Sequence, residues 1–239
     1  MNTVVTPAST PLAVIDVPMH RLSIVVPMYN EVENVEPFVT AVHEALANYG
    51  FPWELLIVND GSRDGTQQAL DEQARLRGPH VRPIHLWRNF RQTAAMQAGI
   101  DAARGDVIVT LDGDLQNDPK DIPKLVARLL KDDMDLVAGW RQNRQDGLWL
   151  RKVPSRIANR LIRKVTQLEF QDLGCSLKAY RASVLKRVSL YGEMHRFIPA
   201  WMATVTTPRR IAEEPTTHHA RTAGVSKYGI SRTFRVILD

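Results

Sequence analysis

Residues 107–119, VIVTLDGDLQNDP, join an unbroken apolar run directly to a group of carboxylates. The run 107–111 shows no alternation with polar residues, which is typical of a strand buried on both faces of a parallel sheet. Asp112 and Asp114 follow at once with a single glycine between them, and Pro119 suits the first turn of a helix. In open α/β sheets, ligands bind beyond the carboxyl ends of such strands. This stretch therefore predicts a buried strand that leads into a polar site.

Two carboxylates separated by one small residue have two interpretations. Mg²⁺ and Mn²⁺ prefer oxygen ligands, and proteins commonly hold them with one or two carboxylates together with phosphate oxygens of a substrate. The alternative is a turn that uses the Asp-Gly sequence, followed by an Asp that caps the next helix, a role for which Asp118 is the candidate. Residues 107–119 alone leave both interpretations open.

The rest of the first half repeats the alternation of short apolar runs with segments of helical periodicity. The expected strands are residues 22–27, 54–58, 81–86, 107–111 and 136–139. The expected helices are residues 33–49, 64–77, 92–104 and 121–131. Strands that alternate with helices of about ten or more residues indicate βαβ units. We therefore expect an α/β fold with a mostly parallel central sheet flanked by helices.

The second half is less regular and more basic. Its expected elements are a basic helix at 148–168, a Gly-Cys-Ser turn that leads into residues 177–180, a short helix at 182–188, an apolar segment at 197–205, a strand at 210–216 and a last helix from 230. Residues 1–136 carry 12 Lys and Arg against 19 Asp and Glu, and residues 137–239 carry 19 against 7, so the net charge of +5 divides into −7 and +12. An acidic half that holds a cation and a basic half that faces an anionic partner would explain the division; uneven decoration of solvent-exposed faces is the alternative.

Residues 148–168 combine an apolar stripe with a basic stripe. The basic stripe contains Arg156, Arg160, Arg163 and Lys164. A basic amphipathic helix suits the surface of an anionic membrane, although a solvated face over a packed stripe explains the pattern equally well. Nucleic acid is disfavoured as a partner, because no stacking aromatic residues are interleaved with the basic ones and the acidic strand ends would repel a phosphate backbone.

Cysteine usage and missing motifs exclude several classes. The single cysteine, Cys175, rules out an intramolecular disulfide framework and a Cys-rich zinc site, and we expect it to be a packing residue. The absence of G-x-G-x-x-G and of G-x-x-x-x-G-K-[ST] weakens assignment as an oxidoreductase or a P-loop phosphotransferase. No run approaches the roughly 20 apolar residues of a transmembrane helix. Residues 1–20 lack a basic residue before an apolar segment and are expected to form a flexible leader.

Acidic residues follow three of the expected parallel strands. Glu31 comes after the first strand, Asp60 after the second, and Asp112 with Asp114 after the fourth. Each alone could be a turn or cap residue. Because the carboxyl ends of parallel strands share one edge of the sheet, together they indicate a polar ligand with its metal. The basic segment 221–228, in which an arginine and a lysine flank a glycine, suits the phosphate of such a ligand.

Five motifs occur in the order in which they are found in a known family. They are VVPMYNE (25–31), VNDGSRDGT (58–66), LDGDLQNDP (111–119), DLGCSLKAYR (172–181) and GVSKYG (224–229). In this order they resemble the family-two inverting glycosyltransferases, and more narrowly the polyprenyl-phosphate glycosyltransferases, which include the dolichol-phosphate mannose synthases. RQNRQD (141–146) and the DLGC motif are most similar to bacterial undecaprenyl-phosphate 4-deoxy-4-formamido-L-arabinose transferases. The resemblance covers about residues 21–239.

This resemblance implies a GT-A fold, which is Rossmann-like, with a nucleotide-sugar across the ends of the parallel strands. The implied reaction moves a sugar from a UDP- or GDP-linked donor to a polyprenyl phosphate (undecaprenyl or dolichyl phosphate), with inversion and with Mg²⁺ or Mn²⁺ as cofactor. The implied place is the cytoplasmic face of a membrane. Transfer to a soluble or cell-envelope glycan, and a nucleotide-sugar-binding module without turnover, are the alternatives.

The same resemblance implies the residues of the site. Those implied to hold the base and ribose of the donor are Pro27, Tyr29, Glu31 and Asp60. Those implied to place the metal on the donor diphosphate are Asp112, Asp114 and Gln116. Those implied to face phosphates of donor or acceptor are Arg141, Lys178, Arg221, Ser226 and Lys227. Asp172 occupies an acidic family position near the acceptor, and we expect catalysis to involve it together with Asp112, Asp114, Arg141 and Lys178.

The chain departs from the family pattern in two places. Members often have an Asn-aromatic-Gly-Gln/Lys turn after the third strand, whereas Arg91 follows Asn89 and Phe90 here, which puts a glycine-dependent approach of this loop in question. Most bacterial members continue into C-terminal membrane helices, whereas residues 230–239 only resemble the approach to the membrane. We therefore expect a domain over residues 21–229, then the start of a membrane-proximal helix in a chain that is truncated or anchored only at the surface. A homo-oligomer is left open.

Overall fold

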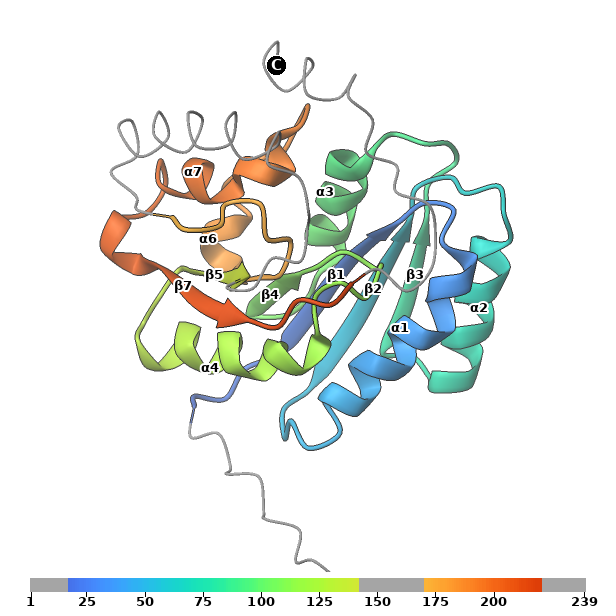
Figure 1. Ribbon diagram of the computed structural model, residues 1–239, viewed down its shortest axis with the longest axis horizontal. Helices are drawn as coiled ribbons and strands as arrows, with labels where there is room; N and C mark the ends of the chain where they lie inside the picture. The colour runs from blue at the N-terminus through green and yellow to red at the C-terminus, as the bar shows by residue number, and fades with distance from the viewer. Residues whose placement is uncertain (1–16, 142–169, 221–239) are drawn as a thin grey trace, which may run out of the picture.

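The computed structural model describes residues 17–141 and 170–220, and within them one sheet is covered by helices on both faces (Figure 1). The strands are β1 (Leu22–Met28), β2 (Trp53–Asn59), β3 (Val81–His85), β4 (Val107–Thr110), β5 (Leu136–Arg141), β6 (Lys178–Arg181) and β7 (Ile211–Thr216). Their order is β3-β2-β1-β4-β6-β5-β7, and every pair is parallel except the two that β6 forms. The predicted α/β fold with a mostly parallel sheet is confirmed.

Helices on the two faces bury the central strands of the sheet, whereas the edge strands β3 and β7 are partly exposed. The helices are α1 (Val32–Ala45), α2 (Thr66–Arg77), α3 (Gln92–Ala102), α4 (Ile122–Lys131), α6 (Ala182–Leu185) and α7 (Ile198–Met202), with 3-10 turns η1 (Pro119–Asp121), η3 (Met194–Phe197) and η4 (Pro208–Arg210). The first face packs against α1, α2 and α4, and the second against α3, α6 and α7 (Figure 1). Ile24 and Val26 enter the first core and Val25 the second. Burial on both sides explains why the strands lack polar alternation.

The elements predicted for the first half agree with the structure to within a few residues. The helix predicted for 33–49 ends at Ala45. The helix predicted for 64–77 begins at Thr66, because Gly65 ahead of it has a φ of 92°, outside the helical range. Hydrophobic periodicity does not report such local backbone conformations, so it predicts the boundaries of a helix only approximately.

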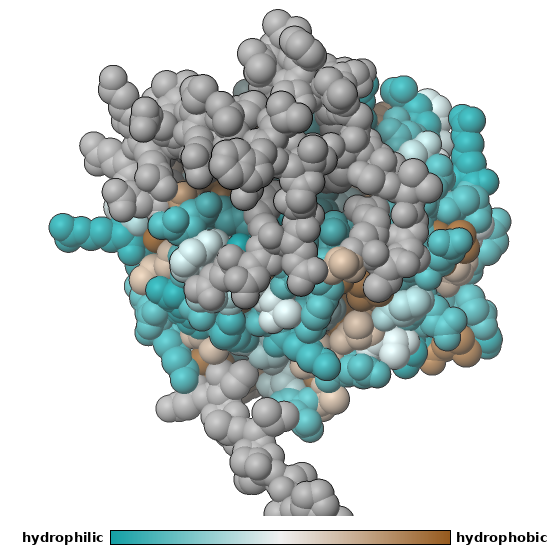
Figure 2. All heavy atoms as spheres, in the orientation of Figure 1, coloured by the Kyte–Doolittle hydropathy of each residue, from teal (hydrophilic) through white to brown (hydrophobic). Residues whose placement is uncertain are grey.

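Some predictions concern residues outside the described segments. The leader predicted for 1–20 is described only in its last part, where His20 is buried and bonds to the Tyr49 hydroxyl at 2.6 Å. The basic helix of 148–168 and the last helix from 230 lie wholly outside. None of the described helices is long and apolar enough to cross a membrane. Figure 2 shows that hydrophilic side chains predominate on the described part of one face, with hydrophobic ones in small separate groups.

The antiparallel strand β6 brings a distant segment to the end of β4. It lies between β4 and β5, with Lys178 opposite both Thr110 and Ala138. The segment that precedes it therefore arrives beside the carboxyl end of β4, where the hydroxyl of Ser176 accepts a hydrogen bond from the N–H of Asp112 at 3.2 Å. The DLGC motif and the Asp112 loop thus become neighbours.

The buried carboxylate of Glu54 connects several segments at the opposite end of the sheet through hydrogen bonds. Glu54 is 7% exposed and accepts hydrogen bonds from the Ser23 hydroxyl at 2.6 Å, the Arg104 N–H at 2.7 Å, and the Arg82 guanidinium. Burial by itself raises the pKa of Glu54, but these donors outweigh it and lower the pKa below the ordinary value of 4.5. The stability that this carboxylate contributes is therefore present above the pKa of the unfolded chain and is lost as the pH falls through the folded-state pKa.

We predict that Glu54→Gln lowers the free energy of unfolding at pH 7 by about 1–3 kcal/mol, because the amide turns a donor toward Arg82. The variant should also lose less stability than the wild type between about pH 5 and pH 3. Urea unfolding across this range measures both effects. Glu72→Gln, which alters a half-exposed carboxylate on α2, is the control and should change little. A pH dependence of Glu54→Gln equal to that of the wild type would contradict the assignment.

Candidate functional site

The carboxyl ends of β1, β2 and β4 meet at one edge of the sheet. β1 pairs in parallel with β2, with Met28 opposite Asn59, and with β4, with Val25 opposite Thr110. The chain therefore winds to both sides of β1, and ligands of open α/β sheets bind at such a switch point. The predicted site residues that follow these strands are Tyr29, Glu31, Asp60, Asp112 and Asp114.

Asp60 holds the loop between β3 and α3. It is 3% exposed, and its Oδ1 accepts a hydrogen bond from the N–H of Phe90 at 2.7 Å. The N–H of Arg91 donates to the same carboxylate. Burial raises the pKa of Asp60, and the two hydrogen bonds oppose that rise. Asp60 thus shapes the loop 86–91, and its contact with a base and ribose stays a prediction.

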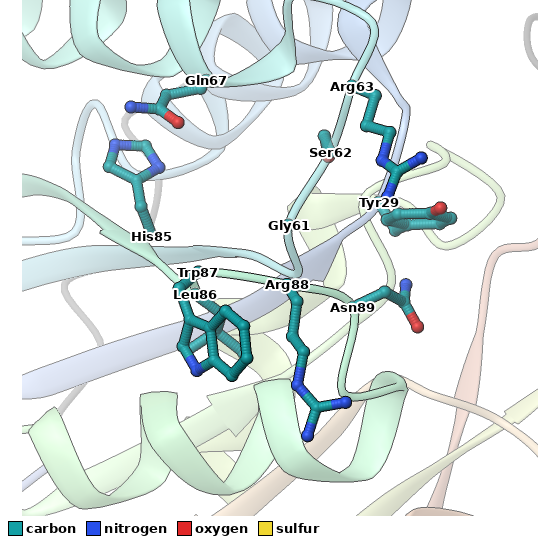
Figure 3. A pocket seen from close by; sticks show the side chains of 10 residues that line it. All are labelled: Tyr29, Gly61, Ser62, Arg63, Gln67, His85, Leu86, Trp87, Arg88 and Asn89. Carbon is teal, nitrogen blue, oxygen red and sulfur yellow. The ribbon is translucent and has the colours of Figure 1, made fainter.

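A pocket of about 300 Å³ opens between the ends of β1, β2 and β3 (Figure 3). It is lined by Tyr29, Gly61, Ser62, Arg63, Gln67, His85, Leu86, Trp87, Arg88 and Asn89. The guanidinium carbon of Arg88 lies 4.8 Å from the ring centroid of Trp87 and 4.4 Å from that of Phe90. Flat aromatic and guanidinium surfaces beside hydroxyl and amide groups suit a planar polar ligand such as a nucleobase.

Gly61 allows the loop after β3 to approach the end of β2. Its φ is 65°, and a Cβ at this position would lie 2.3 Å from the carbonyl carbon of Arg88. Polar side chains complete the turn, since Asn59 accepts from the N–H of Ser62 at 3.0 Å and Ser62 accepts from the N–H of Asn30 at 2.9 Å. The close contact of the two loops therefore requires glycine at position 61.

Asp112 and Asp114 lie on one loop after β4. Oδ1 of Asp112 accepts from the side-chain amide of Gln92 at 2.7 Å, and Oδ1 of Asp114 accepts from the N–H of Gln116 at 3.1 Å. Gly113 between them packs so closely against β1 that an added Cβ would lie 2.5 Å from the nearest side-chain atom. The loop is therefore fixed both to the sheet and to the first residue of α3.

The side chains of this loop fit a hard divalent cation. Asp112, Asp114 and the amide oxygen of Gln116 offer the oxygen ligands that Mg²⁺ and Mn²⁺ prefer. In residues 17–141 and 170–220, no three His, Cys, Asp or Glu side chains gather into a group that could hold an ion. A cation at this loop would therefore need further oxygen atoms, from a phosphate or from water.

Arg141 and Asp172 form a bidentate ion pair at the end of β5. Nε of Arg141 lies 2.6 Å from Oδ2 of Asp172, and Nη2 lies 2.9 Å from Oδ1. The two side chains are 10% and 6% exposed. Glu213 on β7 accepts from the N–H of Asp172 at 2.9 Å, which fixes the backbone of this acidic residue. Asp172 therefore orients the guanidinium of Arg141.

Lys178 lies inside the fold. It is 3% exposed, and its ammonium donates to the carbonyl oxygen of Cys175. Burial lowers the pKa of Lys178 below its ordinary value, and Cys175, Asp172 and Asp112 oppose this shift without cancelling it. The buried ammonium is thus placed to balance these two carboxylates, and its contact with a substrate phosphate stays a prediction. Cys175 itself is fully buried, as expected for a packing residue.

The remaining predicted residues take several positions. Glu31 precedes α1, where its carboxylate accepts from the side chain of Asn34 at 2.6 Å. Asp118 caps η1 by accepting from the N–H of Lys120 at 3.0 Å, which confirms the predicted cap. Pro27 is half-buried within β1. The residues that lie outside the described segments are Arg221, Ser226 and Lys227.

Three residues that the sequence did not indicate also support the site. Gln92 bonds to Asp112, Ser176 accepts from the N–H of that residue, and Glu213 accepts from the N–H of Asp172. Each contact joins segments that are far apart in the chain. The only local signal is the place of Gln92 at the start of a helix after a predicted strand end.

The fold and the strand-end site define an α/β protein with a polar site at the switch point of its sheet. The profile of the family described as Glycosyl transferase family 2 matches residues 23–189, and the chain belongs to this family. A dodecaprenyl-phosphate galacturonate synthase from Rhizobium johnstonii is 58% identical over 92% of this chain and 65% of the relative. An undecaprenyl-phosphate 4-deoxy-4-formamido-L-arabinose transferase from Klebsiella pneumoniae is 38% identical over 93% of this chain and 67% of the relative.

The chain thus spans about two thirds of the length of these curated relatives. The predicted resemblance to polyprenyl-phosphate glycosyltransferases is confirmed, and the galacturonate synthase is the more similar of the two.

Solved structures share the fold at low sequence identity. Glucosyl-3-phosphoglycerate synthase from Mycobacterium tuberculosis, in complex with Mn²⁺, UDP-glucose and phosphoglyceric acid, has a TM-score of 0.68 and 19% identity, covering 90% of this chain and 75% of that chain. A mannosyltransferase from Pyrobaculum calidifontis, in complex with GDP-Man and Mn²⁺, has a TM-score of 0.62 and 17% identity, covering 87% of this chain and 59% of that chain. Both confirm the predicted GT-A fold.

We predict that Gly61→Ala weakens the binding of UDP or GDP by about tenfold or more, because the new Cβ must displace the loop after β3. Gly50→Ala is the matched control, since φ at Gly50 is 78° but a Cβ there meets no atom within 4 Å. Both variants carry similar backbone strain, about 1–3 kcal/mol, so both should lower Tm. Only Gly61→Ala should also weaken binding in titration calorimetry, and equal affinities in the two variants would argue against this account of the pocket.

Proposed function

We propose that this chain transfers a sugar from a nucleotide-sugar to the phosphate of a polyprenyl phosphate, with inversion at the anomeric carbon. The observation that carries the proposal is the position of the loop 112–116. It lies between the pocket suited to a nucleobase, beyond β1 to β3, and the ion pair of Arg141 with Asp172, beyond β5. A donor diphosphate that extends from the pocket would meet the loop, and an acceptor phosphate would meet Arg141. The names of both curated relatives support this choice of acceptor.

The acceptor phosphate supplies its own nucleophile. A phosphate monoester has a second pKa near ~6 and is largely ionised at neutral pH, so its oxygen attacks without a general base. The bond from this oxygen to the anomeric carbon forms on one face of the sugar as the bond to the donor diphosphate breaks on the other. Asp172 then has no proton to accept, and it acts by holding Arg141 for the incoming phosphate.

The harder task is to stabilise the charge that develops on the leaving nucleoside diphosphate. Mg²⁺ or Mn²⁺ held by Asp112, Asp114 and Gln116 would supply a Lewis acid at the diphosphate oxygens. Gln92 fixes the carboxylate of Asp112, and Ser176 fixes its backbone. Groups that are held in place before the reaction cost little reorganisation when the charge appears.

The sugar is proposed from the relatives. Galacturonate appears in the name of the relative with 58% identity, and 4-deoxy-4-formamido-L-arabinose in that of the relative with 38% identity. The higher identity favours galacturonate, an acidic hexose. The nucleotide is best identified with a panel of UDP- and GDP-linked sugars, assayed with Mg²⁺ or Mn²⁺ and a short polyprenyl phosphate.

A lipid acceptor implies a membrane surface. We propose that the chain associates with the anionic cytoplasmic face of a membrane, where the basic stripe of residues 148–168 would meet lipid head groups. This stripe lies outside the described residues, and the support for its role is its sequence pattern. Sedimentation with anionic and with neutral liposomes measures this association, and we expect more of the protein to sediment with the anionic liposomes.

Two rival functions predict different products. A transferase for a soluble or cell-envelope glycan would release nucleoside diphosphate without forming a glycolipid. A nucleotide-sugar-binding module would be stabilised by its ligand but would release no nucleoside diphosphate. Chromatography of both the lipid and the aqueous phase distinguishes all three.

We predict that Asp112→Ala and Asp114→Ala each reduce turnover by about 100-fold or more while the fold survives, because the diphosphate charge is no longer neutralised. Asp118→Asn is the matched control, since it removes a charge from the same loop region but keeps a cap for η1. The rate of nucleoside diphosphate release and the circular dichroism spectrum measure both properties. Metal-independent turnover that persists in both Ala variants would refute the mechanism.

A further inference from the structure

Arg91 occupies a backbone conformation that glycine adopts far more readily than other residues. Its φ and ψ are 76° and 164°, at the turn from the loop after β3 into α3. Residues with side chains are strained in this region, and such residues cluster at functional sites. Nearby contacts impose the conformation, since the N–H groups of Phe90 and Arg91 donate to Asp60 and the side chain of Gln92 donates to Asp112. A glycine would allow the same contacts with less strain.

No contact of the Arg91 side chain within the described residues offsets this backbone strain. The side chain is exposed, and in the described segments it forms no ion pair, in contrast to Arg82 and Arg141, each of which is paired with a buried carboxylate. Its neighbours in sequence are bonded to Asp60 and Asp112, so the residue itself stands at the rim of the candidate site. An exposed cation is thus kept beside the site at a cost in stability.

We propose that Arg91 determines donor specificity by binding the carboxylate of an acidic sugar. This inference rests on the proposed function and names the residue that recognises the sugar. A guanidinium binds a carboxylate through two parallel hydrogen bonds, and it stays charged at any physiological pH. Two other described cations at this edge of the sheet already have partners: Arg141 forms an ion pair with Asp172, and Lys178 donates a hydrogen bond to the carbonyl of Cys175.

The donor diphosphate is the other anion that a guanidinium at this position could bind. Every UDP- or GDP-linked sugar carries this diphosphate, whereas galacturonate adds a carboxylate to it. UDP-galacturonate and UDP-galactose differ in this carboxylate alone. Comparing these two donors therefore separates the two sources of negative charge.

The test measures kcat/KM for both donors with a short polyprenyl phosphate and Mg²⁺, and Kd for both donors by titration calorimetry. Arg91→Gly should lower the preference for UDP-galacturonate over UDP-galactose by about 10- to 100-fold in both measurements. Its Tm should equal that of the wild type or exceed it by up to about 4 °C, because the strain is relieved. Arg91→Lys keeps the charge and should retain most of the preference.

Arg104→Ala is the control, since it removes an exposed cation just beyond the other end of α3 and should leave the preference unchanged. An unchanged preference in Arg91→Gly overturns the proposal, and so does an equal loss with both donors, which would place the guanidinium on the diphosphate. If the wild type neither binds nor uses UDP-galacturonate, the proposed identity of the donor sugar is wrong as well. If the wild type uses this donor and Arg91→Gly uses it with the same preference, the proposed role of Arg91 is wrong but the proposed function stands.

Discussion

The parallel pairing of β1 with both β2 and β4 is the constraint on which the rest of the structure depends. Because the three strands are parallel, the turns that follow them share one edge of the sheet, and the change of winding direction at β1 makes this edge the place where a ligand can bind. Helices on both faces stabilise this arrangement by burying apolar residues on each side of every central strand. The antiparallel β6 then extends the sheet beyond β4 and sets the DLGC segment and Arg141 on the far side of the same edge.

The loop 86–91 converts this edge into a site of defined shape. The carboxylate of Asp60 accepts a hydrogen bond from the backbone of this loop, and the loop can lie close to β2 because Gly61 has no Cβ. The loop leads into Gln92, whose side chain donates a hydrogen bond to Asp112. Pocket and carboxylate loop are therefore parts of one hydrogen-bonded unit. Arg91, whose backbone is strained, lies within this unit. Strained residues are found at functional sites, where the loss of stability is accepted because the residue serves binding.

Much of this could be predicted from the sequence, because strands buried on both faces and amphipathic helices leave strong periodic patterns. The carboxylates after β4 and the cap formed by Asp118 were also accessible, since both depend on neighbouring residues. The position of β6 between β4 and β5 was not, because no local pattern specifies which strand is a partner. The burial of Lys178 follows from that insertion, and a lysine in a sequence gives no sign that its ammonium will bond to a buried carbonyl.

The central claim is that the sugar alone passes from the donor to a lipid phosphate. The most direct measurement uses a nucleotide-sugar that is labelled with ¹⁴C in the sugar and with ³²P in the β-phosphate, incubated with the chain, Mg²⁺ and a short polyprenyl phosphate. We predict that ¹⁴C enters the lipid phase while ³²P remains in water-soluble nucleoside diphosphate. Transfer of both labels to the lipid, or retention of both in the aqueous phase, would contradict the central claim.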